Sequence, residues 1–331
     1  MFWIVENNKQ LELFTRLDYD EVFLEPILSN DNVHPKLNDV IAIYIRGINA
    51  SKGYMVCLDH SETTSCSCFK LNYNKIYVRN KKLCTYFFNT KNFKDLHFLA
   101  DFNVDITTPA HTYFNAKFPE KLNVNRIVPM VKHYEKCELI FEEVKETMSK
   151  NPPNHFEFFN TKATNCFYWI EKNGLRIDKK LLKENFELNK EINSLNGKYI
   201  YSQYNLYTTT KRPSNSFNGV NFAALKKEGG VRKTFIPEND ELLEIDISAY
   251  HPTLIAQLIG YKFKEKDIHQ HFADLYGVDY QKSKQLTFKQ LYGGVFKEYE
   301  HIEFFAKTKK YIQELFKKFN DEGYRGTDFR V

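Results

Sequence analysis

Two adjacent prolines divide this chain of 331 residues into parts with different sequence patterns. The segment 151–154 reads Asn-Pro-Pro-Asn and cannot continue a helix, because proline lacks a backbone N–H and its ring clashes with the preceding turn. Residues 1–150 have the pattern of a mixed α/β domain, and residues 151–331 are mainly helical. The sequence therefore predicts an α/β (α+β) protein of two domains, which suits its length.

In the first part, residues 40–45 and 54–58 read as strands joined by a turn at residues 49–53. Helices are expected near residues 91–100 and 134–149. Strands joined by a tight turn and followed by helices are what the α/β interpretation requires.

In the second part, the period of the apolar residues predicts a helix over residues 156–172, closed by Gly174, and another over residues 179–197. Residues 201–235 are polar and rich in loops, and residues 242–247 read as a short buried strand. Three further helices are expected at residues 252–260, 281–291 and 297–319.

The net charge of +5 is compatible with a nucleic-acid partner but does not require one. The six cysteines form no Cys-x-x-Cys pair, which favours free thiols in a reducing compartment. The first residues do not read as a signal peptide, and no apolar run is long enough to span a bilayer. We therefore expect no membrane partner and a cytoplasmic location, in the host cytoplasm if the protein is viral.

The sequence places chemistry-bearing residues at two points of the second part. Asp246 follows the apolar segment 242–247, where its carboxylate and the Ile247 carbonyl could hold a divalent metal against phosphates. Lys284, Phe288 and Tyr292 recur every four residues and so share one helical face, offering a cation and two rings. The alternatives are that Asp246 caps the following helix and that the aromatic residues are ordinary core.

Four segments, in order, resemble the family A DNA polymerases, the group of bacterial DNA polymerase I and many phage replicases. The resemblance covers about residues 155–331. The segments are residues 167–178, residues 208–215 with 220–222 and 230–235, residues from 246 onward (motif A), and residues 284–293 (motif B).

The resemblance implies a partial polymerase domain with thumb base, palm and fingers. Asp246 would bind two catalytic Mg²⁺ ions with the help of the Ile247 carbonyl. Lys284 would contact the triphosphate of the incoming dNTP, Phe288 would flank its sugar and base, and Tyr292 would line the pocket of the template base. These roles imply nucleotidyl transfer to a primer 3′-hydroxyl by a two-metal mechanism.

The resemblance also implies contacts with the DNA primer–template. Arg212 and Asn221 would touch its minor groove, and Arg232 and Lys233 follow close behind. The alternative is a polar surface loop with no partner.

The chain departs from the family pattern in three places. His251, preceded by Tyr250, stands where a Glu is usual, and we infer that Tyr250 or His251 excludes a ribose 2′-hydroxyl by bulk. Tyr280 stands in place of an Arg, whose charge Lys282 is expected to supply. The second catalytic carboxylate normally lies far beyond motif B, and residues 321–322 (Asp-Glu) read only as a polar helix end.

The first part lies where the family carries a 3′–5′ exonuclease. Residues 1–150 contain no Asp-x-Glu, and the nearest substitute is Asp18-Tyr19-Asp20. Four other candidate residues are scattered and interpreted as surface or turn residues: Asp101, Asp105, His111 and His133. We therefore predict a degenerate exonuclease-like domain, with a working nuclease as the alternative.

The sequence thus predicts a template-directed DNA polymerase of phage or viral type that acts in DNA replication, present as a fragment or as one subunit of a split enzyme. The alternative is a non-catalytic primer–template-binding subunit that needs a second polypeptide with the missing carboxylate.

Overall fold

The structure is a computed structural model that describes residues 3–322, apart from residues 65, 68–69, 101–124, 187–194, 209–212, 217–219 and 227–228. The chain forms two compact units, Met1–Glu241 and Leu242–Val331. Residues on both sides of the two prolines therefore belong to the first unit.

A six-stranded mixed sheet forms the centre of the first unit, which is mixed α/β as expected. Its strand order is β1-β4-β3-β2-β5-β6. The pairs β2–β3 and β3–β4 are antiparallel, whereas β1–β4, β2–β5 and β5–β6 are parallel. The strands are β1 Ile4–Val5, β2 Glu21–Leu28, β3 Val40–Gly47, β4 Tyr54–Cys57, β5 Lys75–Val78 and β6 Phe93–Asp95. The predicted strands at 40–45 and 54–58 are confirmed.

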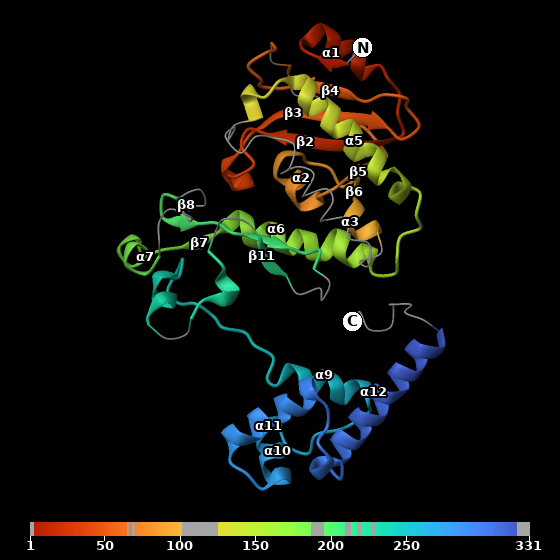
Figure 1. Ribbon diagram of the computed structural model, residues 1–331. Coiled ribbons are helices and arrows are strands. Elements are labelled where there is room, and N and C mark those ends of the chain that lie inside the picture. The colour runs from red at the N-terminus through yellow and green to blue at the C-terminus, as the bar shows by residue number, and fades with distance from the viewer. Residues whose placement is uncertain are drawn as a thin grey trace. The chain divides into compact units, whose positions relative to one another are not determined.

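Helices cover both faces of this sheet (Figure 1). Helix α5, Met130–Met148, packs Tyr134 and Phe141 against Phe23 and Tyr44 on one face. Helix α1, Asn8–Thr15, packs against the other face. The remaining short helices are η1 Pro35–Leu37, α2 Lys81–Phe87, α3 Leu96–Leu99 and η2 Asn125–Ile127. Because both faces are covered, β2 and β3 are buried along almost their whole length.

The helix predicted at 156–172 is confirmed, although its first part, η3 Phe158–Ala163, is π-helical before α6, Thr164–Asn173. Gly174 ends α6 with a φ of 66°. A Cβ atom there would lie 2.8 Å from the Ile200 carbonyl oxygen, so this close turn requires glycine.

The rest of the first unit consists of short elements in a loop-rich stretch, as predicted for residues 201–235. They form a three-stranded sheet, β7-β9-β8, and a two-stranded sheet, β10-β11. The elements are β7 Leu175–Arg176, α7 Lys179–Asn185, β8 Leu195–Asn196, β9 Tyr199–Ile200, β10 Gln203–Asn205, β11 Ser214–Ser216, η5 Phe222–Ala224 and η6 Val231–Thr234.

The helix predicted over residues 179–197 is wrong in its last part. Helix α7 ends at Asn185, and Leu195–Asn196 forms strand β8, while residues 187–194 lie outside the described residues. Asn196-Gly197, with Gly197 at a φ of 61°, turns the chain into an antiparallel hairpin with β9. The Asn-Gly pair is a strong turn signal. The prediction followed the helical period of the preceding apolar residues instead and so extended the helix through the turn.

The second unit is helical in its described part. It comprises α9 Tyr250–Leu258, α10 Ile268–Tyr276, α11 Tyr280–Gly293, η7 Lys297–Tyr299 and α12 Glu303–Glu322. These helices confirm the predictions at 252–260, 281–291 and 297–319 within a few residues, and α10 was not predicted. Their hydrophobic core consists of Ala256, Ile268, Phe272, Ile302, Phe304 and Phe305. The second half of α12 lies outside this core, since Phe316 and Phe319 are 65% and 50% exposed.

The buried strand predicted at residues 242–247 is wrong. These residues belong to no strand or helix, and Leu243 and Ile245 are 84% and 86% exposed. A strand needs a hydrogen-bonding neighbour, and the described residues of the second unit are helices and loops.

The structure places some of the residues that were considered as nuclease candidates in the first part of the chain. Asp18 and Asp20 precede β2, as expected. His133 is buried in α5 with Nε2 3.0 Å from the Asn125 carbonyl oxygen, so its interpretation as a surface or turn residue is wrong. Asp101, Asp105 and His111 lie outside the described residues.

Five cysteines of the described chain are free: Cys57, Cys66, Cys84, Cys137 and Cys166. No described helix is long and apolar enough to cross a membrane.

His34 makes the stability of the first unit depend on pH. Its Nδ1 accepts a hydrogen bond from the Lys36 backbone N–H (3.1 Å), and its Nε2 donates to the Ser202 carbonyl (3.2 Å). Burial lowers the pKa of this imidazole to about 4. The folded state therefore binds fewer protons than the unfolded state between about pH 4 and pH 6.5, and stability falls as the pH drops through this range.

We expect the free energy of unfolding of the first unit to fall by on the order of 3 kcal/mol between pH 6.5 and pH 4 through His34. The variant His34→Gln should lose this part of the pH dependence. Both tryptophans, Trp3 and Trp169, lie in the first unit, so denaturant titrations followed by tryptophan fluorescence report on it alone. If the free energy of unfolding of the variant fell as steeply between pH 6.5 and pH 4, His34 would not be the source of this pH dependence.

Candidate functional site

Helix α11 buries a polar face rather than an apolar one. Ser283, Thr287 and Gln290 are at most 1% exposed and face α10. The Ser283 hydroxyl donates to the His269 carbonyl (2.9 Å), and Gln290 Nε2 donates to the Tyr276 hydroxyl (2.9 Å). These hydrogen bonds join α10 and α11, although Gln290 Oε1 is buried with no hydrogen-bond partner among the described residues.

The predicted residues lie on the other faces of α11. Lys284 is exposed, Phe288 is half-buried and Tyr292 is 69% exposed. The rings of Phe288 and Tyr292 are stacked, with centroids 6.2 Å apart and an interplanar angle of 14°. The interpretation of these aromatic residues as ordinary core therefore does not hold for Tyr292.

The start of α9 meets the end of α11. Ala249 has a φ of 46°, the left-handed conformation, and turns the chain from the preceding segment into α9. The hydroxyl oxygen of Tyr292 lies 3.3 Å from Nδ1 and 3.4 Å from Nε2 of His251, and the Tyr250 ring lies edge-on to His251 at 5.3 Å. The structure thus brings Tyr250 and His251 of α9 together with Tyr292 of α11.

His269 joins this cluster and was missed in the sequence. Its ring centroid lies 6.1 Å from that of Phe288 and 5.8 Å from that of Tyr280. Its Nδ1 is buried with no hydrogen-bond partner among the described residues, and burial, followed by the nearby Lys284 charge, lowers its pKa. No spacing rule links residue 269 to α11, since only the packing of α10 against α11 brings them together.

Asp246 is exposed and makes no hydrogen bond or ion pair with the described residues. It does not cap the next helix, because the residue at the N-cap of α9 is Ala249. Its neighbour Ile247 is 59% exposed. The structure records no contact between Asp246 and Lys284, so their convergence on one cavity stays a prediction. Among the described residues, no group of three or more His, Cys, Asp or Glu could hold a metal ion by itself.

A second candidate surface lies in the first unit. Ile177, Leu182, Ile200 and Val220 form a small core beneath it. Asn221, Arg232 and Lys233 are exposed above this core, and Arg232 Nη2 donates to the Leu225 carbonyl at 3.1 Å. Arg212 lies outside the described residues.

Comparisons with known proteins add no relative, because no protein-family model and no curated protein matches the chain.

Substitutions on the buried and exposed faces of α11 should change the stability of the second unit by different amounts. We expect Tyr292→Ala to change the stability of the second unit by less than about 0.5 kcal/mol, because the side chain is exposed. Thr287→Ala should cost about 1–2 kcal/mol, since it removes a buried hydroxyl 3.2 Å from the Tyr276 hydroxyl. Amide hydrogen exchange in α10 and α11 measures both changes. Equal losses would show that Tyr292 belongs to the core.

Proposed function

We propose that the second unit binds the incoming nucleotide of a template-directed DNA polymerase of family A type, and that the exposed loops of the first unit bind the primer–template. The observation that carries the proposal is the display of Lys284 and Tyr292 on the outer faces of α11, with Tyr292 in contact with His251. A helix that buries small polar residues and exposes a cation and rings is arranged for a ligand rather than for core packing.

Each residue has a defined chemical task in this proposal. The Lys284 ammonium group neutralises phosphate oxygens as a point charge. Phe288 and Tyr292 offer ring faces to the base and sugar. His251 is held beside the Tyr292 hydroxyl, and with Tyr250 it crowds the place of a ribose 2′-hydroxyl. His269 adds an imidazole next to Lys284 and Phe288.

The residues present fit part of a Mg²⁺ site. Asp246 offers an exposed carboxylate that pairs with none of the described residues, and Ile247 offers a neighbouring carbonyl, both hard oxygen ligands. The remaining ligands would be phosphate oxygens and a second carboxylate, which the proposal assigns to another polypeptide segment. When bound, Mg²⁺ would supply Lewis-acid stabilisation of charge on the phosphates.

In this proposal the first unit is a degenerate exonuclease-like domain, and its mixed α/β fold is compatible with that interpretation. Three antiparallel strands, β4-β3-β2, continue into parallel β5 and β6. The buried carboxylate on its central strand, Glu25, accepts hydrogen bonds from Arg79, with Nε at 2.9 Å. The Arg79 guanidinium thus pairs with this carboxylate, which is the kind of partner a buried charge requires.

Nucleotide binding tests the proposal. We expect a fluorescent dATP analogue to bind in Mg²⁺, and Asp246→Ala to remove the Mg²⁺-dependent part of the affinity, more than about 10-fold. Lys284→Ala should weaken binding with and without Mg²⁺. Glu244→Ala is the matched control, because Glu244 is an exposed acid on the same segment. Equal effects at positions 244 and 246 would contradict the proposal.

A primer–template-binding subunit is the second candidate, because Asp246 alone does not complete a metal site. Such a subunit binds DNA but adds no nucleotide to a primer when Mg²⁺ and dNTPs are present. Single-nucleotide addition by the chain itself would exclude this candidate.

Binding of primer–template DNA should be salt-dependent through Arg232 and Lys233. We expect the double variant Arg232→Gln/Lys233→Gln to reduce the slope of log affinity against log salt by about 2. The control Lys179→Gln/Lys180→Gln removes the same charge from exposed positions of neighbouring α7. Fluorescence anisotropy at several salt concentrations measures the slopes. Identical slopes in the two variants would contradict a specific role for Arg232 and Lys233.

A further inference from the structure

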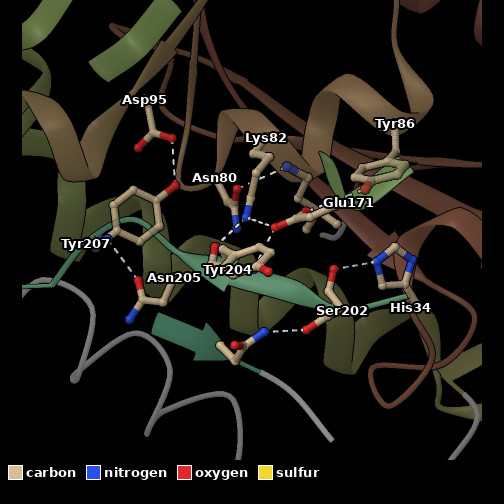
Figure 2. Close-up of polar contacts among 12 residues, drawn as sticks. His34, Asn80, Lys82, Tyr86, Asp95, Glu171, Ser202, Tyr204, Asn205 and Tyr207 are labelled. Carbon is tan, nitrogen blue, oxygen red and sulfur yellow. Dashed lines mark hydrogen bonds and ion pairs between the residues drawn. The ribbon is translucent and has the colours of Figure 1, made fainter. Parts of the chain in front are cut away.

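The stretch from Tyr201 to Tyr207, which contains β10, is held against the sheet-bearing part of the first unit by buried polar contacts (Figure 2). Its contacts come from residues far apart in the sequence: His34, Lys82, Asp95 and Glu171 of α6. These four side chains are buried. Such a concentration of satisfied buried polar groups fixes geometry as well as adding stability.

Lys82 and Glu171 bind the middle of the stretch. Lys82 Nζ donates to Glu171 Oε1 and to the Tyr204 carbonyl, and the Tyr204 backbone N–H donates to the same Glu171 oxygen at 2.6 Å. Both backbone groups of Tyr204 are therefore held by side chains from α2 and α6.

Asp95 binds the end of the stretch. Its Oδ2 accepts hydrogen bonds from the Tyr207 hydroxyl (2.7 Å) and the Lys81 backbone N–H (2.8 Å). The Tyr207 ring also lies over His97, with centroids 4.1 Å apart. Figure 2 shows the Tyr207 hydroxyl pointing at the Asp95 carboxylate.

Ser202 connects the stretch from Tyr201 to Tyr207 to the surface around Asn221, Arg232 and Lys233, which is the candidate for DNA binding. His34 holds the Ser202 carbonyl, while the Ser202 hydroxyl donates to the Val220 carbonyl (3.3 Å) and lies 2.6 Å from Asn215 Nδ2. Asn215 Oδ1 in turn accepts from the Ala223 backbone N–H at 3.4 Å. Asn221, exposed, lies between Val220 and Ala223 in the chain, so the two contacts bracket it.

We propose that Ser202 and Tyr207 are positioning residues that hold Asn221 in place for primer–template binding, with the exonuclease-like part of the first unit as their rigid support. This inference rests on the proposed function. It gives that part a role in DNA affinity that requires no nuclease chemistry.

The positioning role differs from a purely structural role in how substitutions combine. If Ser202 acts through Asn221, Ser202→Ala weakens DNA binding in the parent chain but has no further effect once Asn221 is replaced by Ala. If it only stabilises the fold, the two effects on affinity add.

The experiment measures the affinity of the full chain for a labelled primer–template duplex by anisotropy, in the four combinations of Ser202→Ala and Asn221→Ala. We expect Ser202→Ala to weaken binding about 5-fold in the parent and less than about 2-fold in the Asn221→Ala background. Tyr207→Phe, which keeps the ring and removes only the hydroxyl, should also weaken binding and so serves if Ser202→Ala does not fold. Tyr199→Phe is the control, because it removes a hydroxyl bonded to Glu238 at the surface, 2.8 Å from Oε1.

Unchanged affinity in Ser202→Ala and Tyr207→Phe, or an equal loss from Ser202→Ala in both backgrounds, would overturn the inference. If the parent chain binds no primer–template, the proposed function itself is contradicted. The two failures are therefore distinguishable.

Discussion

The first unit depends on the buried ion pair between Lys82 and Glu171. Burial lowers the pKa of the Lys82 ammonium and raises that of the Glu171 carboxyl, and their mutual attraction opposes both shifts. Taking two charges out of water is unfavourable unless further hydrogen bonds satisfy them, as Tyr204 does here. Removing one partner of such a pair typically costs about 3–5 kcal/mol. Helices α2 and α6 and strand β10 thus meet at this ion pair, and ring contacts between Tyr86 and Tyr168 and between Phe167 and Tyr204 join the same elements.

Buried polar hydrogen bonds also join helices in the second unit. The interface between α10 and α11 uses Ser283, Thr287 and Gln290, whose hydrogen bonds replace part of the apolar packing. Because these polar residues take the face toward α10, Lys284 and Tyr292 remain exposed, while Leu291 packs against the apolar core. The apolar core of this unit is supplied instead by α9, α10 and the start of α12.

Local patterns predicted β3, β4, α5, α6, α9, α11 and α12 but missed many of the other elements, and the helix expected near residues 91–100 is instead strand β6 followed by the short helix α3. The strands β3 and β4 alternate or run apolar over several residues, and Gly174 marks the end of α6 in both sequence and structure. The central strand β2 was missed because Glu25 and Pro26 interrupt its apolar run, and only the ion pair with Arg79 makes a buried Glu25 acceptable. The strand expected at residues 242–247 failed for the opposite reason. Its composition suits a strand, but a strand also requires a neighbour.

The sequence by itself determined that Lys284, Phe288 and Tyr292 share one side of a helix, because a spacing of four residues matches the helical turn. It could not determine whether that side faces the core, since aromatic residues pack as readily as they bind. The tertiary structure decided this by burying the polar residues of α11 against α10 and by bringing His251 beside Tyr292 and His269 beside Phe288. Hydrogen bonds and burial between segments far apart in the chain set that choice, and no local pattern encodes them.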